Sequence, residues 1–235
     1  MSGTDSRPGR SAFYLATDPD YDPEACPVKF RLTYEGPLHA SSNGNGRASH
    51  KHEIRKAFHP QLKRLWAVEP NLIRWEYTEN QVRPEAKKFA VGGKVPGWGD
   101  LASSFGRCGY QFVPLVSERY SLFCGLEILF LRDGSPGSII KSGDIDNRLK
   151  TLFDALRMPS SQDELGGHNT PGEGEDPFFV LLEDDKLLNH VSVETDILLN
   201  PSPSAQQQWV ANDCRLVITV SIRPAAVTLN NIHLI

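Results

Sequence analysis

The sequence predicts an α+β fold: a single domain with a mixed or antiparallel β-sheet and helices packed on one face. Three observations predict it. Segments with the alternation and the β-branched and aromatic enrichment of strands occur towards both ends of the chain. Between them, residues 143–156 carry an apolar stripe at helical spacing. The length of 235 residues suits one large domain with decorations.

The N-terminal part of the chain begins with residues 1–27, which are rich in Pro, Asp, Ser and Gly and show no sustained period. This composition predicts a flexible arm, followed by one domain over 28–235. A first strand is expected over 28–34. A helix is expected over 50–66, and Pro60 should kink or restart it. Its apolar residues recur at steps of three and four: Ile54, Phe58, Leu62 and Leu65.

The middle of the chain gives weaker signals. Residues 67–110 are mixed in character and Gly-rich around VGGKVPGWGD, which predicts an inserted loop region. A long strand signal follows within 112–131. A second inserted loop is expected at about 157–177, where hydrophobicity is low. Three further strands are predicted from FFVLLEDD, VSVETDILL and CRLVITVSI.

Composition and charge exclude several classes of protein. The net charge of −4 argues against a protein that coats DNA, although a local basic patch can still hold phosphate. The four cysteines lack the close spacing of a zinc knuckle. No apolar run approaches the ~20 residues of a membrane span, and MSGTDSRPGRS lacks the apolar core of a signal peptide. The expectation is a cytoplasmic protein of a prokaryotic or phage-infected cell, with no membrane partner.

The predicted helix at 143–156 carries charged residues away from its apolar stripe. Asp144 and Asp146 stand at its start, where the exposed N–H groups and the helix dipole favour carboxylates. Asp146, Lys150 and Asp154 lie four residues apart in turn and therefore share one face. Taken alone, this segment is more typical of an ordinary capped surface helix with a paired Asp and Lys.

The strand predicted from FFVLLEDD adds a second acidic group, because it ends in Glu183, Asp184 and Asp185. Like charges at a strand end are tolerated when they are solvated or when a cation lies among them. A strand end beside the helix start would bring Asp185 near Asp144 and Asp146. Oxygen-only carboxylate ligands suit Mg²⁺, with Mn²⁺ as an alternative, and not zinc. Carboxylates beside a lysine suit phosphodiester hydrolysis. The carboxylates bind a metal that activates water, and the lysine offsets negative charge that develops at the phosphorus.

The compound pattern D-x-D-N-x-x-K, a helical D-A-L and an apolar strand ending in D-D resembles the RusA-type Holliday junction resolvases. The likeness covers about residues 119–222. It implies a homodimeric, Mg²⁺-dependent endonuclease that nicks four-way DNA junctions symmetrically. By that resemblance, Asp144, Asp146 and Asp185 would bind metal, with Asp184 a further candidate ligand. Lys150 would assist at the transition state, while Asn147 would hold the loop or a neighbouring carboxylate.

A cluster of basic residues at 47–64 is a candidate surface for DNA phosphates, with Arg55 and Lys56 foremost. The alternative is the solvated face of an amphipathic helix. Where the family often has a basic run before its motif, this sequence reads IIKSG. His50 and His52 are either metal ligands or, more commonly for such residues, ordinary solvent-facing histidines. The candidate phosphate contacts are Lys51, Arg55, Lys56, Lys63, Arg64 and Lys141.

The leading hypothesis is therefore a Mg²⁺-dependent endodeoxyribonuclease that resolves Holliday junctions or other branched DNA. One alternative is a RusA-fold protein that binds DNA or a protein partner without cutting. Another is a metal-dependent nuclease that acts on a different nucleic-acid substrate.

Overall fold

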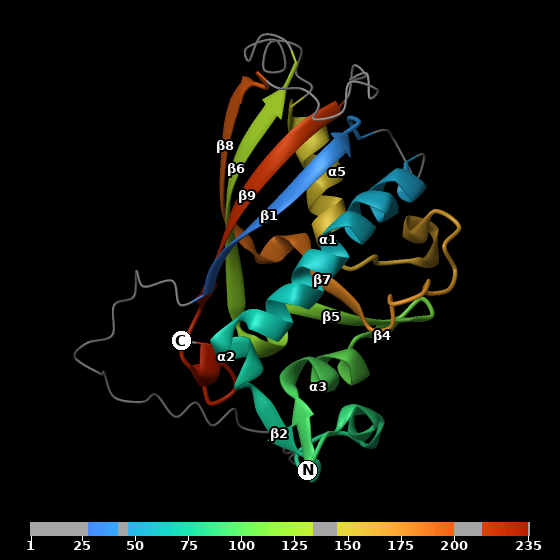
Figure 1. Cartoon of the computed structure of the whole chain (residues 1–235), viewed down its shortest axis with the longest axis vertical. Coiled ribbons are helices and arrows are strands. Elements are labelled where there is room, and N and C mark those ends of the chain that lie inside the picture. The colour runs from blue at the N-terminus through green and yellow to red at the C-terminus, as the bar shows by residue number, and fades with distance from the viewer. Residues whose placement is uncertain (1–27, 42–46, 134–144, 200–212, 235) are drawn as a thin grey trace, which may run out of the picture.

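The computed structural model describes residues 28–41, 47–133, 145–199 and 213–234, and it is an α+β fold with mixed sheets (Figure 1). The strands form three sheets, of four, two and three strands, where one sheet was expected. The predicted α+β class and mixed strand pairing are confirmed.

The four-stranded sheet has the order β1-β9-β6-β8. Its strands are β1 (Val28–Pro37), β6 (Leu122–Arg132), β8 (Leu188–Ile197) and β9 (Asp213–Pro224). β9 pairs antiparallel with β1 and β6, whereas β6 and β8 are parallel. The inward residues of β9 alternate along the strand, as a half-buried sheet requires. They are Cys214, Leu216, Ile218, Val220 and Ile222.

The three-stranded sheet lies beside the larger one and has the order β4-β5-β7. β4 (Gly106–Arg107) pairs antiparallel with β5 (Tyr110–Val116), and β5 pairs parallel with β7 (Phe178–Leu182). All five residues of β7 are buried. A strand covered on both faces reads as a continuous apolar run, which is why FFVLL shows no alternation.

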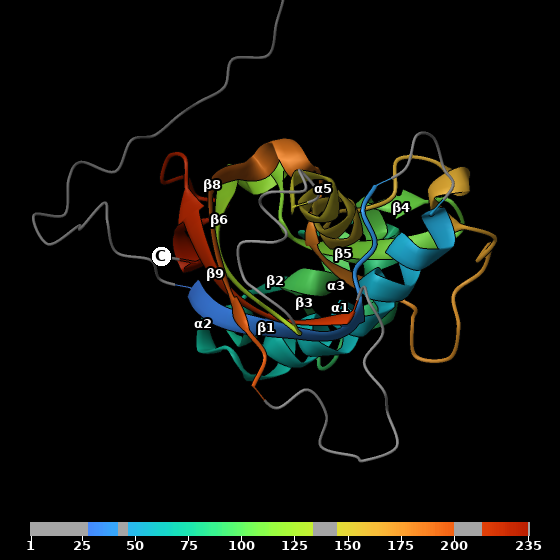
Figure 2. The same cartoon turned by 90° about the horizontal axis from the view of Figure 1, so that it is seen from above.

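Two long helices cover these sheets: α1 (Ala48–Val68) and α5 (Ile145–Leu156). Seen from above, the four-stranded sheet curves around α5, which lies on the inner side of the curve (Figure 2). Pro60 stands inside α1, yet the helix runs unbroken to Val68. The expected restart at Pro60 is therefore not observed.

The region 67–110, expected as an inserted loop, forms a series of short elements instead. α3 (Gly97–Ser104) follows directly on β3 (Lys94–Pro96), and Gly97 at their junction donates from its N–H to the carbonyl of Trp75 at 2.6 Å. A Cβ at Gly97 would collide with the Trp75 ring, so this close approach requires glycine. The elements are α2 (Pro70–Ile73), β2 (Glu76–Thr78), η1 (Pro84–Phe89), β3 (Lys94–Pro96), α3 (Gly97–Ser104) and then β4.

The segment 157–177 contains the short 3₁₀ helix η3 (Gln162–Leu165) and is held to the rest of the protein. The hydroxyl of Tyr110 donates to the carbonyl of Thr170 at 2.9 Å. Gly166, at φ +59°, lies against the backbone of Ser49 so closely that a Cβ would clash. The remaining 3₁₀ helices are η2 (Glu118–Tyr120), η4 (Asp185–Leu187) and η5 (Ile232–Leu234).

One large buried cluster joins the two larger sheets to the helices. It includes Phe58 of α1, Leu115 of β5, Leu152 of α5 and Ile218 of β9. In the part of the chain that the structure describes, no helix has the length and apolar character needed to cross a membrane.

Candidate functional site

The α5 helix presents two of the predicted catalytic residues to solvent. Asp146 and Lys150 are both exposed and lie one turn apart. The opposite side of the helix is buried through Leu152, Ala155 and Leu156. Asp144 and Lys141 lie outside the described residues.

The acids that follow β7 have different environments. Glu183 accepts a hydrogen bond from the backbone N–H of Glu118 at 2.9 Å. Asp184 accepts from the N–H of Lys186 at 3.0 Å and so caps η4. Asp185, the first residue of η4, is exposed. Of the three acids, Asp185 is therefore the one most open to a ligand, whereas Asp184 has a structural partner.

The end of β7 meets the C-terminal end of α5. The N–H of Met158 donates to the carbonyl of Leu182 at 2.9 Å, and Arg157 forms a β-bridge with the same residue. Asp146 lies eleven residues before Arg157, which is about 16 Å along a helix axis. η4 then lies against α5. The end of β7 thus meets α5 at the C-terminal end of the helix, and not at the first turn, which carries Asp146.

The described carboxylates do not complete a metal site by themselves. Within residues 28–41, 47–133, 145–199 and 213–234, no three His, Cys, Asp or Glu side chains gather closely enough to hold a metal ion. Asp146, Asp184 and Asp185 therefore do not form such a group among these residues. The predicted ligand set includes Asp144, which falls outside them, so its fit to Mg²⁺ stays a prediction.

Arg55 requires a correction, because its side chain is 1% exposed and already hydrogen-bonded. The guanidinium donates to the backbone carbonyls of Arg157 at 3.0 Å and Asp154 at 2.8 Å. It also contacts Nδ1 of His52 at 3.1 Å. A buried guanidinium with these partners ties α1 to the end of α5 and does not reach a phosphate.

The other basic residues of α1 differ in burial and in their ion-pair and hydrogen-bond partners. Lys51 is mostly buried and forms an ion pair with Asp154, with Nζ 2.6 Å from Oδ2. Lys56 lies 3.5 Å from Glu175, and Lys63 donates to the carbonyl of Gly174 at 3.0 Å. Arg64 is exposed. The exposed residues Lys63 and Arg64 are thus the ones on α1 best placed to meet a phosphate.

Asp154, the third charged residue of the predicted α5 face, belongs to an ionic network between α1, α5 and η3. Arg157 bridges Asp154 at 3.2 Å and Glu164 at 3.0 Å. Burial acts to raise the pKa of Glu164, but hydrogen bonds from Arg157 and Ser160 outweigh it and lower the pKa to about 2. Glu164 is therefore charged at neutral pH, and its pairing with Arg157 holds the loop at 157–177 in place.

The histidines of α1 divide into two kinds. His52 and His59 are buried, which contradicts the expectation of a solvent-facing His52. Burial, with the nearby charge of Arg55, lowers the pKa of His52 to about 3. His50 instead faces His39, with ring centroids 4.6 Å apart. His50 and His52, the two candidate metal ligands, thus lie in separate environments.

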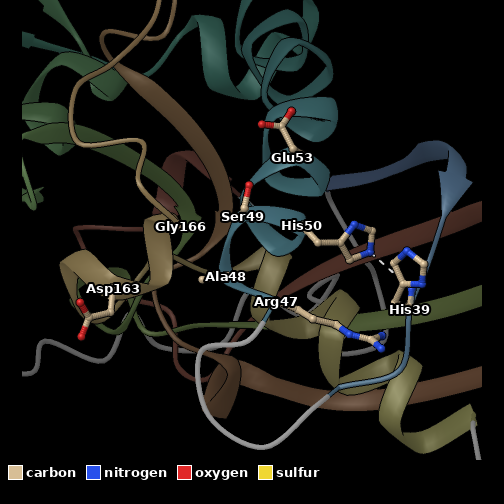
Figure 3. Close-up of a pocket in the computed structure, with 8 residues that line it drawn as sticks. All are labelled: His39, Arg47, Ala48, Ser49, His50, Glu53, Asp163 and Gly166. Carbon is tan, nitrogen blue, oxygen red and sulfur yellow. Dashed lines mark hydrogen bonds between the residues drawn. The ribbon is translucent and has the colours of Figure 1, made fainter.

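His39 and His50 line a pocket of about 670 Å³ at the start of α1 (Figure 3). Arg47 lies on the same side of the pocket as the two rings and donates to the carbonyl of Ala40. The N–H of His39 donates to Nε2 of His50 at 3.4 Å. The lining residues are His39, Arg47, Ala48, Ser49, His50, Glu53, Asp163 and Gly166.

Two hydrogen bonds join this pocket to the first turn of α5. The N–H of Ser41 donates to the carbonyl of Asn147 at 2.9 Å. The guanidinium of Arg148 donates to the carbonyl of Leu38. The segment that carries His39 is thus attached directly after Asp146.

Sequence reasoning missed the pairing of His39 with His50. His39 falls in a turn-rich stretch with no period, and only the fold places it against α1. Arg47 was visible as part of the basic segment 47–64, but its role at a pocket was not.

Comparisons of the chain with protein-family models, with curated proteins and with solved structures found no match. The function proposed below therefore rests on residues and on their geometry.

Proposed function

We propose that the chain is a Mg²⁺-dependent, structure-selective endodeoxyribonuclease that resolves Holliday junctions or other branched DNA. The observation that carries the proposal is the exposed pair Asp146 and Lys150, one turn apart on α5. The exposed Asp185 belongs to η4, which lies against the same helix after β7 has met its C-terminal end. These residues belong to the D-x-D-N-x-x-K and D-D pattern of the RusA-type resolvases. Asp144 and Asp146 are the proposed ligands of Mg²⁺ or Mn²⁺, and the resemblance to the resolvases adds Asp185 as the third.

The remaining parts of the proposal follow from this chemistry. Lys150 would stabilise negative charge that develops on the phosphoryl group. The chain would fold as a single RusA-like domain and act as a homodimer, because symmetric cutting of a junction needs two like sites. Arg64 and Lys63 on α1 are the described basic residues most open to DNA phosphates.

The test is a nicking assay with a labelled four-way junction, a matched duplex and single strands, each with Mg²⁺ and with EDTA. We expect junction-selective nicking that needs Mg²⁺ and falls at least about 100-fold in Asp146→Asn. Glu194→Gln, an exposed acid on β8, is the matched control and should cut normally. Lys150→Ala should remain folded but cut more slowly, whereas Lys87→Ala should match the wild type.

A second candidate function has one specific observation in its favour. Since no three carboxylates gather among the described residues, a branched-DNA or protein-binding role without cleavage fits those residues equally well. Tight junction binding with no Mg²⁺-dependent nicking would select this candidate. Cleavage that ignores branching would instead indicate a nuclease with another nucleic-acid substrate.

A further inference from the structure

The pocket at the start of α1 has an electropositive side. Arg47, His39 and His50 gather there, and Figure 3 shows their side chains close to one another. Burial lowers the pKa of His39, and the charges of Arg47 and Arg148 lower it further, against an opposing effect of Asp213. Two guanidinium groups therefore act on this ring, and a cation would be repelled from it.

The acidic residues of the pocket stand apart from this side. Glu53 contacts His168 at 3.1 Å and Lys56 at 3.9 Å, so its charge has partners. Asp163 is exposed, and its carboxylate points away from the two histidine rings in Figure 3. The space between Arg47 and His50 is thus suited to a negatively charged group.

The donors that face this space match a phosphate. Arg47 has further N–H groups besides the one given to Ala40. Nε2 of His50 accepts from the backbone, so its Nδ1 carries the proton and can donate. The first turn of α1 has neither a side-chain cap nor an acidic residue, so the positive end of the helix dipole lies uncompensated beside these donors. A phosphate accepts from all of these donor types.

We infer that this pocket holds one backbone phosphate of the nucleic-acid substrate, with Arg47, His39 and His50 as its contacts. The hydrogen bond from Ser41 to Asn147 sets the pocket beside the first turn of α5, where Asp146 is exposed. A strand held there would run past the proposed reaction centre. The inference takes its nucleic-acid partner from the proposed function, but the pocket itself does not depend on cleavage.

The test uses Ser49→Asp, which places an acid in the pocket without weakening the fold. Ser49 is exposed, and an acid in the first turn of a helix stabilises it. In EDTA, the affinity for a four-way junction should fall about tenfold, and the slope of log K against log salt should fall by about one. The matched control is Ser192→Asp, which adds the same charge on exposed β8 and should leave binding within about twofold of wild type.

A second measurement needs no DNA. Titration with inorganic phosphate, followed by NMR of the histidine rings, should shift His39 and His50 in the wild type but not in Ser49→Asp. His190, exposed on β8, should stay unchanged. Equal junction affinity in the two Asp variants would overturn the inference.

The outcomes separate the pocket from the nuclease proposal. Junction binding that Ser49→Asp weakens, in a protein that never nicks DNA, would support the pocket and overturn the nuclease. Normal nicking by Ser49→Asp would support the nuclease and overturn the pocket. Phosphate shifts at His39 without any nucleic-acid binding would overturn the assignment of nucleic acid as the partner.

Discussion

Asp154, a residue of the sequence motif, has a different role from the other charged residues on the same helix. Asp146 and Lys150 are exposed, whereas Asp154, the next residue in the four-residue series, has a side chain only 13% exposed. Its two carboxylate oxygens meet Lys51 and Arg157. These partners assign Asp154 to the structure of the protein and leave the proposed chemistry on α5 to Asp146 and Lys150.

We therefore predict that Asp154→Asn mainly lowers stability. Removing one partner of a buried ion pair leaves Lys51 and Arg157 without their acid, at a cost of about 3 kcal/mol in the free energy of unfolding. Urea denaturation measures the change, and Asp163→Asn, at an exposed acid, should alter it by less than about 0.5 kcal/mol. An Asp154→Asn protein with wild-type stability but no nicking would move this residue into the reaction centre.

At the scale of elements, the long segments could be predicted and the short ones could not. The strands β1, β6, β8 and β9 and the helices α1 and α5 lie where their hydrophobic periods indicated, and β7 lies where its continuous apolar run did. The elements of the region 67–110 could not be predicted because its strands are only two or three residues long. Segments this short carry no period, and contacts such as Gly97 against Trp75 define them.

The candidate site was predictable only in part, for a related reason. Local spacing placed Asp146 and Lys150 together on one helix face. The burial of Arg55 depends on carbonyls 99 and 102 residues away, and the pairing of His39 with His50 depends on where a loop returns. The local spacing of residue types does not indicate contacts between residues that are far apart in sequence.

Pro60 gives a prediction for the α1 element. Because proline has no N–H, the carbonyl of Lys56 lacks its intrahelical donor, although the helix continues. Pro60 is exposed, so alanine should fit without a clash and restore the bond. Pro60→Ala should raise the free energy of unfolding by about 1–3 kcal/mol, as measured in urea by circular dichroism. A loss of stability would show that α1 needs the local geometry that proline imposes.

At the scale of the whole molecule, a continuous core joins parts of the chain that are distant in sequence. The main cluster contains Phe58 of α1, Trp75 after α2, Leu115 of β5 and Ile218 of β9. A smaller cluster, which includes Tyr110 and Phe178, lies between β5, β7 and the loop at 157–177. If both larger sheets share one core, neither should unfold without the other.

We therefore predict one cooperative unfolding transition. In a Trp209→Phe background, emission comes from Trp66, Trp75 and Trp98, all within or against the main cluster. Circular dichroism reports the secondary structure of the whole chain. Leu216→Ala, in β9, opens a cavity in the four-stranded sheet and should cost about 2–4 kcal/mol.

The two probes should shift to lower urea by the same amount in Leu216→Ala, because the sheet and the tryptophan region unfold as one unit. A fluorescence midpoint that stays fixed while the dichroism midpoint moves would divide the chain into two units. The first turn of α5 and the pocket at the start of α1 would then be free to shift against each other. A phosphate in that pocket would no longer be held in register with Asp146, so the shared core is a physical condition for the proposed site.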